Sequence, residues 1–313
     1  MKISLLVGFI FFTQVFVFAQ NEEAVSIEYD SATLHGTLLN AAGGSSIAIL
    51  IIPGSGPTDR DGNSPLFQGK NNSLKYLAEF MGEEGISSLR IDKRGIAQSQ
   101  TGAKEEDMSF EDYINDAAEW VKFLKTEKNF EKVLIAGHSE GSLVGMIAVQ
   151  RCEADGFISL AGGGFPLDEV IAKQLEAQPP MVLEPSLAIM AKLKAGEMEE
   201  EVPQFLFSLF RPSVQPYLIT LFKYDPAVEI AKLDMPVLIV QGGMDVQVDD
   251  PNGEVLKNAL PSADYLYAPK MNHVLKTVEE KVLAKQLPVY GDPTLPLDDD
   301  LKAGLKAFFG KIK

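Results

Sequence analysis

The chain has almost no cysteine and little histidine. Cys152 is the only cysteine, and there are three histidines among 313 residues. A lone cysteine cannot form an internal disulfide, so the fold has to rest on an apolar core. Three scattered histidines and one thiol also fall short of the usual zinc ligand sets, so we expect no metal site. Cys152 itself is predicted to be an inert, packed thiol near a helix end.

Basic residues are also scarce. The chain carries 28 Lys and Arg residues against 44 Asp and Glu residues, which gives a formal net charge of −16. Phosphate recognition needs a basic surface, so nucleic acid is not expected as a partner. The sequence also contains no internal repeat and no low-complexity linker, which favours an ordinary globular domain.

Long hydrophobic runs are absent except at the N-terminus. Residues 1–20 read MKISLLVGFIFFTQVFVFAQ, with Lys2 before an apolar stretch and a small residue, Ala19, near its end. This order is typical of a secretory signal peptide. The apolar run of about 15 residues is short for a membrane span, so an uncleaved anchor is the weaker alternative. We expect residues 1–19 to be removed, the protein to be periplasmic or secreted, and no stable membrane insertion to remain.

Strand-like and helix-like segments alternate from about residue 46 onward. Short apolar runs ended by Gly, Pro or Asp are typical of strands buried on both faces of a parallel sheet. The clearest helical segment follows Ser109, with Asp112 completing a capping box and Trp120 on its apolar face. This alternation predicts an α/β fold with a mostly parallel, doubly wound sheet, preceded by an antiparallel hairpin. The hairpin is expected at Ala24–Asn40 and the later strands at Ser46–Ile52, Ile86–Ile91, Lys132–Ala136, Gly156–Leu160, Pro236–Gln241 and Ala263–Tyr267.

The alternation is interrupted once, between the fourth and fifth of these later strands. Residues 165–224 contain several helical stretches and no clear strand. A connection of about 60 residues between two strands is usually functional, so this segment is interpreted as a helical cap over the active site. The core then comprises residues 20–164 and 225–313. The apolar side chains of the cap either line an acyl pocket or only pack the cap onto the core.

One short motif, the sequence GHSEG at residues 137–141, carries the chemistry. It stands between a buried strand and a helix, and a turn this sharp needs glycine on both sides of a strained central residue. The turn presents the hydroxyl of Ser139 at a helix N-terminus, where free amides favour negative charge. We therefore predict Ser139 as a nucleophile. A glycine-rich turn with an incidental serine is the alternative, but the strand before it and the helix after it argue against that reading.

A serine nucleophile needs a general base, and the three histidines of the chain are the candidates. His273 follows the last predicted strand, at the same sheet edge as Ser139, and is predicted to be the general base. His138 is expected to be a supporting residue whose side chain points away from the base. His35 lies in the predicted hairpin and is expected to be packed or solvated.

The base in turn needs a carboxylate to orient it and to stabilise its charged form. Asp245 follows the predicted strand 236–241 and precedes His273, which gives the order Ser, Asp, His of this kind of fold. Asp249 and Asp250 remain alternatives, although they lie further from the strand in a loop that leads into a helix.

An oxyanion hole requires two amides aimed at the developing negative charge. The amide of Glu140, directly after the nucleophile, is one candidate. The other is expected in the loop PGSGPTDRDGN at residues 53–63, where small residues let the backbone approach a substrate. Ser55 is the first choice there and Gly56 the second, with Gly54 as a supporting residue. The remaining polar residues of this loop and of the segment RIDKRGIAQS are expected to brace neighbouring loops: Arg60 with its flanking aspartates, and Asp92, Arg94 and Ser99.

With these residues in place, the chain resembles the α/β-hydrolase-fold serine hydrolases. It is similar to their secreted or periplasmic esterase-like members with a PGSGPTDRDGN loop, and to the neighbouring serine aminopeptidase-like group. The segments IIPGSGPTDRDGN, LRIDKRGIAQS, AGHSEGS, PVLIVQGGMDVQV and MNH carry the resemblance. It implies a lidded hydrolase that acts on short-chain carboxylic esters without metal or cofactor. Ala97 and Ser142 depart from this pattern, since glycine is common at both positions.

The hypothesis from the sequence is therefore an esterase that forms an acyl-enzyme on a small-molecule ester. A peptidase of the same fold is the nearest alternative, and Glu199–Glu201 could then bind a peptide amine. An acyl-CoA thioesterase fits poorly with export. A non-catalytic binding protein on the same scaffold is the alternative from another class, and the complete set of Ser, Asp and His argues against it. The sequence indicates no particular oligomeric state.

Overall fold

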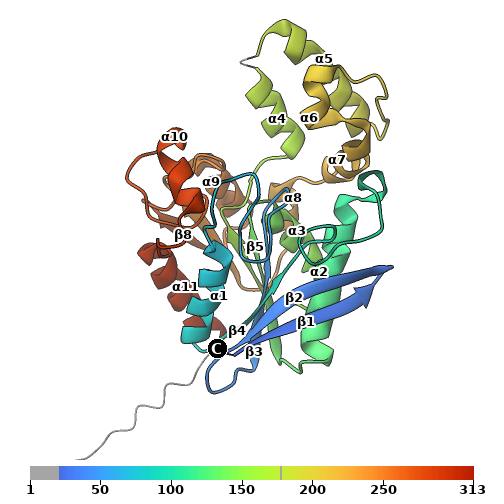
Figure 1. Cartoon of the computed structure of the whole chain (residues 1–313). Coiled ribbons are helices and arrows are strands. Elements are labelled where there is room, and N and C mark those ends of the chain that lie inside the picture. The colour runs from blue at the N-terminus through green and yellow to red at the C-terminus, as the bar shows by residue number, and fades with distance from the viewer. Residues whose placement is uncertain (1–20, 177) are drawn as a thin grey trace, which may run out of the picture.

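A twisted eight-stranded sheet forms the centre of the fold (Figure 1). The structure is a computed structural model that describes residues 21–176 and 178–313, so the predicted signal peptide, residues 1–19, lies outside the described residues. The strand order is β1-β2-β4-β3-β5-β6-β7-β8. The strands are β1 Asn21–Tyr29, β2 Ala32–Asn40, β3 Ile47–Ile52, β4 Ser87–Ile91, β5 Lys132–His138, β6 Gly156–Leu160, β7 Val237–Gly242 and β8 Asp264–Ala268.

The sheet is antiparallel at one end and parallel over the rest. β1 and β2 form the predicted hairpin, β2 pairs antiparallel with β4, and the remaining neighbours pair in parallel. Every residue of β3, β4, β6 and β7 is buried. A continuous apolar run predicts this for β3, whereas β4 reads SSLRI and buries two serines and Arg90 as well. β8 departs from that expectation because it is the edge strand, and only Ala268 in it is buried.

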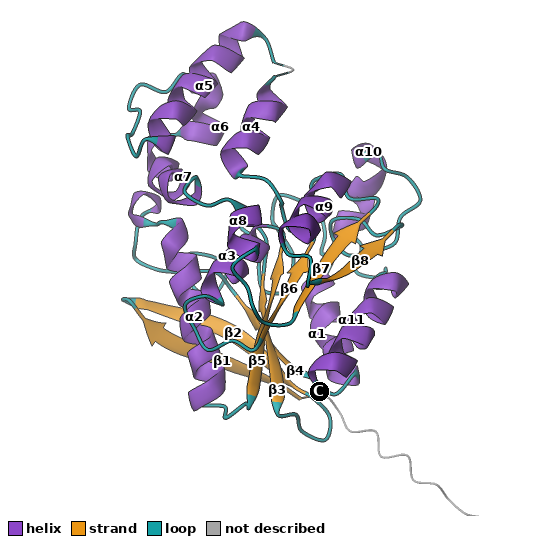
Figure 2. Ribbon diagram, turned by 180° about the vertical axis from the view of Figure 1, so that it is seen from behind, coloured by secondary structure: helices purple, strands orange, loops and turns teal. Residues whose placement is uncertain are grey.

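Helices cover both faces of the sheet, which gives the doubly wound α/β architecture (Figure 2). On one face the apolar side chains of α1 and α11 join one buried cluster. On the other face α2, α3, α8 and α9 join a second. These helices are α1 Ser73–Glu83, α11 Asp299–Ile312, α2 Phe110–Thr126, α3 Glu140–Ala148, α8 Pro226–Ile230 and α9 Asp250–Ala259, with the shorter η1 Glu105–Asp107, α10 Leu283–Gln286 and η4 Leu287–Gly291 beside them.

The helix α2 shows how the sequence signals become structure. The Asp112 carboxylate accepts hydrogen bonds from the Ser109 amide at 2.6 Å and the Ser109 hydroxyl at 3.0 Å, so the predicted capping residues do start the helix. Trp120 is fully buried and packs edge-on against Phe123, with ring centroids 5.5 Å apart. The only tryptophan is therefore a core residue.

A group of helices between β6 and β7 rises above the sheet (Figure 1). These helices have an apolar cluster of their own, built around buried residues such as Leu193 and Phe210. They sit on the core through α7, where Tyr217 packs against Phe110 and Tyr113 at centroid distances of 5.9 and 5.8 Å. We call them the cap: α4 Leu167–Leu175, α5 Pro180–Lys194, η2 Gln204–Leu206, α6 Phe207–Phe210, η3 Pro212–Val214 and α7 Gln215–Leu221.

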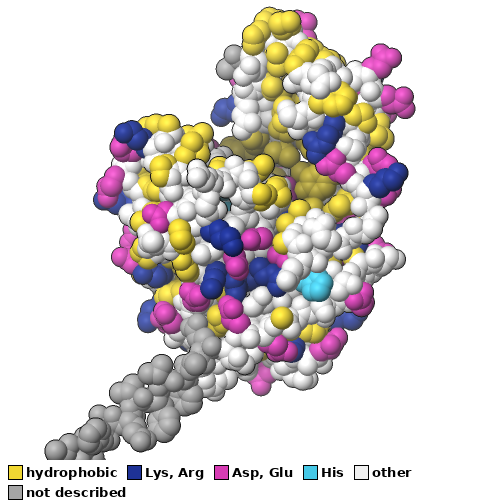
Figure 3. Space-filling model, in the orientation of Figure 1, with side chains coloured by type: hydrophobic (Ala, Val, Ile, Leu, Met, Phe, Trp, Pro, Cys, Tyr) yellow, Lys and Arg dark blue, Asp and Glu magenta, His cyan; other side chains and the backbone are white. Residues whose placement is uncertain are grey.

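The surface is hollowed between the cap and the part of the core that carries α10, and hydrophobic side chains gather in this hollow (Figure 3). The hollow lies on the side of the sheet where the parallel strands end, which is where ligands bind in open α/β sheets (Figure 1). Across residues 21–176 and 178–313, none of the helices combines the length and apolar character that a bilayer span requires.

Candidate active site

Ser139 occupies a strained turn between β5 and α3. Its backbone has φ 56° and ψ −121°, a conformation that costs a non-glycine residue about 1–3 kcal/mol. A side chain on Gly137 would come within 2.1 Å of the Gly141 carbonyl oxygen, and one on Gly141 within 2.5 Å of the Ile52 carbonyl oxygen. Both glycines are thus required by close backbone packing. The turn leaves the Ser139 side chain partly exposed at the N-terminus of α3.

The two departures from the family pattern are accommodated locally. Ser142 is fully buried and shares a hydrogen bond of 2.8 Å with Ser159. There is room for it because Gly162 has no side chain, and a Cβ there would lie 2.4 Å from the Ser142 hydroxyl. Ala97 adopts φ 46°, in the left-handed region that glycine occupies most easily.

His273 and Asp245 form the central contact of the site. His273 Nδ1 lies 2.8 Å from Asp245 Oδ2, and Asp245 is fully buried. The other carboxylate oxygen, Oδ1, accepts hydrogen bonds from the Gln247 and Val248 amides at 2.8 and 2.9 Å. The carboxylate is therefore fixed just beyond β7, and it fixes the imidazole that follows β8.

The other acidic and imidazole candidates lie in different contacts. Asp249 accepts a hydrogen bond of 2.7 Å from the Asn252 side chain at the start of α9. Asp250 pairs with Lys281 at 3.1 Å. His35 lies within β2, where its register partner is on β1. None of these side chains is the partner of His273 in this structure.

His138 links the nucleophile turn to the base. Its Nε2 lies 2.8 Å from the His273 carbonyl oxygen, and the two rings have centroids 4.9 Å apart. The expectation that this side chain points away from the base is wrong, because the end of β5 runs directly beside the His273 loop. Burial, together with the neighbouring His273, lowers the pKa of His138 to about 4, so the ring stays neutral and Nε2–H donates to the carbonyl. Among the described residues no hydrogen bond joins Ser139 Oγ to His273, a contact that often tightens only in a substrate complex.

The loop after β3 reaches the nucleophile. A Cβ on Gly54 would stand 3.1 Å from Ser139 Cβ, a tight contact, so the glycine leaves room for this backbone beside the nucleophile. Ser55 follows with an exposed side chain, and its carbonyl accepts a hydrogen bond of 2.9 Å from the Thr58 hydroxyl. Glu140 directly follows Ser139 as the first residue of α3, and Ser55 directly follows Gly54, the residue that approaches Ser139. That the amides of Ser55 and Glu140 form an oxyanion hole stays a prediction.

Polar residues brace these loops as predicted. The Arg60 guanidinium meets Asp92 Oδ2 at 2.5 Å, and the Arg60 amide donates to Asp92 Oδ1 at 2.9 Å. The Ser99 hydroxyl donates to the Asp92 carbonyl at 3.0 Å. Arg94 pairs with the buried Asp116 on α2, away from the turn. These contacts tie the loop after β3 to the loop after β4.

Sequence reasoning missed Lys93. Its side chain is buried, with Nζ 2.5 Å from the Gly54 carbonyl oxygen and 3.6 Å from Glu140 Oε1. Burial lowers the pKa of Lys93, and the Glu140 carboxylate opposes that change. The available signal was a lysine directly after a buried strand, beside the loops expected to form the site.

In the described part of the chain, the side chains that commonly bind metals are not clustered, and Cys152 is partly buried. No group of three or more His, Cys, Asp or Glu side chains within this part is arranged to hold a metal ion. Burial raises the pKa of Cys152 to about 11, which keeps the thiol protonated and unreactive.

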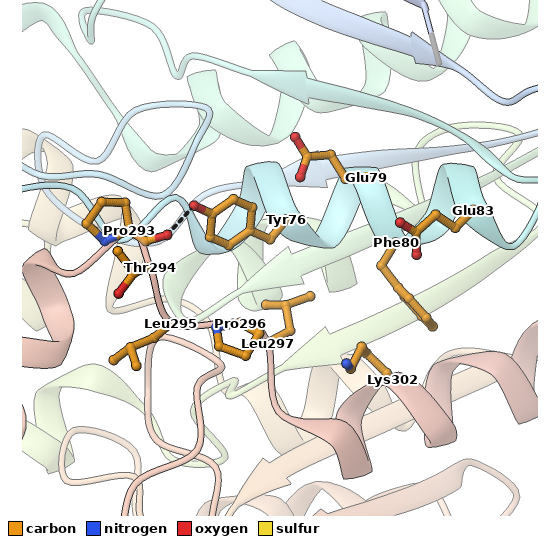
Figure 4. A pocket seen from close by; sticks show the side chains of 10 residues that line it. All are labelled: Tyr76, Glu79, Phe80, Glu83, Pro293, Thr294, Leu295, Pro296, Leu297 and Lys302. Carbon is orange, nitrogen blue, oxygen red and sulfur yellow. Dashed lines mark hydrogen bonds between the residues drawn. The ribbon is translucent and has the colours of Figure 1, made fainter. Parts of the chain in front are cut away.

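A surface groove lies outside the candidate active site. It has a volume of about 330 Å³ and runs between α1 and the segment 293–297 (Figure 4). Tyr76 borders it and donates to the Pro293 carbonyl at 2.5 Å, while Phe80 and Lys302 line its other end. No residue of the candidate active site lines this groove.

Known proteins resemble the chain in sequence. Residues 68–195 match the family described as serine aminopeptidase, S33. Esterase EstD of Thermotoga maritima is 31% identical over 244 residues, which is 75% of this chain and 56% of EstD. The chain thus spans a little over half the length of this curated relative.

Solved structures resemble the chain in fold. Est1E from Butyrivibrio proteoclasticus with ferulic acid bound superposes with a TM-score of 0.58 at 18% identity, covering 85% of this chain and 96% of Est1E. The Pyrococcus furiosus esterase Pf2001 superposes with a TM-score of 0.57 at 16% identity, covering 93% of each chain. At these identities the likeness shows the fold alone.

Proposed function

We propose that the chain is an α/β hydrolase of the group that contains esterases and serine aminopeptidases, and that it cleaves short-chain carboxylic esters through an acyl-enzyme on Ser139. The observation that carries the proposal is the buried His273–Asp245 contact of 2.8 Å at the sheet edge where Ser139 stands. The sequence relative named as an esterase supports the choice of ester substrates.

In the proposed reaction, Ser139 Oγ attacks the ester carbonyl carbon while His273 Nε2 takes its proton. The carbonyl oxygen becomes an oxyanion that accepts hydrogen bonds from the Ser55 and Glu140 amides. His273 then returns the proton to the leaving alcohol, and the acyl group stays on Ser139. Water, activated by His273, releases the acid. Asp245 holds the imidazole in the required tautomer and stabilises its charged form.

The aminopeptidase alternative requires a free carboxylate to bind a peptide amine. The Glu199 carboxylate, in the acidic stretch of the cap, already pairs with Lys192 at 2.5 Å. The Glu140 carboxylate beside the nucleophile faces Lys93. Glu199 and Glu140 thus have cationic partners, whereas Glu200 and Glu201 form no salt bridge within the described residues. The ion pairs of Glu199 and Glu140 favour esters over peptides with a free amine.

Export is part of the proposal. It rests on the charged start, apolar stretch and small residues of the segment 1–19. N-terminal sequencing of the protein from cells that carry the full gene tests it, and a mature chain that begins near Gln20 is the expected result. A chain that retains Met1 or Lys2 would contradict cleavage.

The activity is tested with initial rates on two panels of substrates. One panel holds p-nitrophenyl acetate, butyrate and octanoate, and the other holds aminoacyl and dipeptidyl p-nitroanilides. We expect ester turnover that declines with acyl length and disappears in Ser139→Ala. Faster anilide than ester turnover would favour the peptidase, and turnover that persists in Ser139→Ala would reject the nucleophile.

A further inference from the structure

A buried ammonium group stands between the two segments that would supply the oxyanion hole. Lys93 follows β4 and is only 4% exposed. Its Nζ contacts the Gly54 carbonyl on one side and the Glu140 carboxylate on the other, at 2.5 and 3.6 Å. It also lies 5.3 Å from the centroid of the Tyr113 ring on α2. Three separate parts of the fold thus converge on one side chain.

We propose that Lys93 is a positioning residue for the oxyanion hole, holding the Gly54–Ser55 peptide in its productive orientation and compensating the Glu140 carboxylate next to the nucleophile. This inference rests on the proposed function. Lys93 touches neither substrate nor reacting atoms in this account, and it acts through the two backbone amides.

The first part of the inference follows from peptide geometry. The Gly54 carbonyl and the Ser55 amide belong to one planar, trans peptide unit, so they point in opposite directions. A cation that binds the carbonyl oxygen therefore fixes the direction of the Ser55 N–H. The close approach of Gly54 to Ser139 sets where that N–H stands. Without Lys93 the peptide loses the contact that prevents it from turning.

The second part concerns charge. Glu140 directly follows the nucleophile, and its carboxylate lies 3.6 Å from the same ammonium that binds the Gly54 carbonyl, so the carboxylate lies close to the segment proposed to supply the second amide. An uncompensated negative charge there would raise the energy of the tetrahedral intermediate. The Lys93 ammonium at 3.6 Å offsets that charge, and the charge-assisted bond to Gly54 remains.

The cap closes this arrangement from above. Tyr217 on α7 is partly buried and lies beside Glu140. That burial, with the adjacent carboxylate, raises the pKa of Tyr217 well above its usual value, so the hydroxyl stays protonated. Through Tyr217 the cap therefore contacts the same carboxylate that Lys93 compensates, a carboxylate that is 16% exposed.

The test uses Lys93→Met, which keeps an apolar side chain of similar length and removes the charge. We expect kcat for p-nitrophenyl acetate to fall about 10²-fold or more, as it does when an oxyanion-hole donor is lost. KM should stay within about threefold, because the interaction belongs to the transition state. Affinity for an aryl trifluoromethyl ketone, which forms an oxyanion on the nucleophile, should fall by a similar factor.

A second variant separates the two roles and guards against misfolding. In Lys93→Met/Glu140→Gln no charge is left unpaired, so the protein should fold even if the single variant does not. We expect this double variant to regain about tenfold in kcat over Lys93→Met and to remain below wild type, because the Gly54 carbonyl still lacks its donor.

Arg94→Met is the matched control. Arg94 is the next residue, is also buried, and also pairs with a carboxylate, Asp116, but its contacts lie away from Ser139. The Arg94→Met substitution should lower the melting temperature and leave kcat within about threefold of wild type. A similar fall in kcat in Arg94→Met and Lys93→Met would overturn the inference, since general loosening would explain both.

Failure of the inference differs from failure of the proposed function. Suppose that wild type shows Ser139-dependent turnover and that Lys93→Met keeps the kcat and the inhibitor affinity of wild type. The inference is then wrong and the proposed function stands. If Lys93→Met does not fold, the double variant takes its place in this comparison. If wild type shows no Ser139-dependent turnover, the proposed function is wrong and the inference falls with it.

Discussion

The two oxygens of the Asp245 carboxylate have different partners. Oδ2 lies 2.8 Å from His273 Nδ1, and Oδ1 accepts hydrogen bonds from the Gln247 and Val248 amides. The two amides keep the carboxylate from rotating, so it presents one fixed oxygen to the imidazole. A general base held this way is aligned before substrate arrives, which avoids an ordering cost during the reaction.

Replacement of Asp245 by asparagine is predicted to lower kcat about 10⁴-fold, because an amide would hold His273 in the wrong tautomer. The measurement is steady-state hydrolysis of p-nitrophenyl acetate. Asp249→Asn is the control and should keep activity within about threefold, since Asp249 serves only the start of α9. Unchanged turnover in Asp245→Asn would reject Asp245 as the orienting acid.

Ser55→Ala is predicted to retain kcat within about threefold, because the proposed donor is the backbone amide and the side chain is exposed. The same ester assay provides the test. A loss of about 10²-fold would mean that the Ser55 hydroxyl itself contacts the developing charge.

Stability should depend on pH through His138. Its pKa in the folded protein is about 4, below the usual value of 6.5, so the unfolded chain binds a proton first as the pH falls. Stability from this group is therefore complete above pH 6.5 and decreases toward pH 4, by about 3 kcal/mol in all. Neighbouring His273 and Asp245 also affect this pKa, and burial is the largest cause.

The measurement is urea unfolding followed by Trp120 fluorescence at several pH values between 4 and 7. His138→Gln keeps a side-chain N–H for the His273 carbonyl and removes the titrating ring. We expect the free energy of unfolding of wild type to fall more steeply with acid than that of the variant. Parallel curves for the two proteins would contradict the assignment.

The glycines of the nucleophile turn allow a test of packing. Gly137→Ala is predicted to cost about 3 kcal/mol or more, because a Cβ there would meet the Gly141 backbone at 2.1 Å. Gly163→Ala is the control and should stay within about 0.5 kcal/mol, since its Cβ would meet nothing within 4 Å. Chemical denaturation gives both values, and equal effects would reject the close approach at the turn.

Much of this fold could be predicted from local patterns. A continuous apolar run indicates a buried parallel strand such as β3, and Ser109 with Asp112 indicates the start of α2. Both can be found without tertiary information. Ser139 could be found because the turn has its own sequence signature. His273 and Asp245 could be found because parallel strands end at a common edge.

Other features depend on contacts between distant segments. The approach of His138 to His273 spans 135 positions, and the end of β5 does not reveal which loop will pass beside it. Lys93 carries no local sign that its ammonium will bind the Gly54 carbonyl, 39 residues earlier. β8 is less buried than its apolar residues predict because it lies at the edge of the sheet. Its edge position depends on the strand order of the whole sheet, which a local pattern does not reveal.

The most direct test of the central claim is to trap the acyl-enzyme. Purified protein that begins at Gln20 would be mixed with p-nitrophenyl acetate, quenched in acid within milliseconds to seconds, digested and examined by mass spectrometry, with Ser139→Ala treated in the same way. The account predicts an acetyl group on the peptide that contains Ser139, formed in a burst and absent from the variant. Hydrolysis with no acetylated Ser139 would contradict the account. An acetyl group on another residue, formed and lost at the rate of steady-state turnover, would contradict it too.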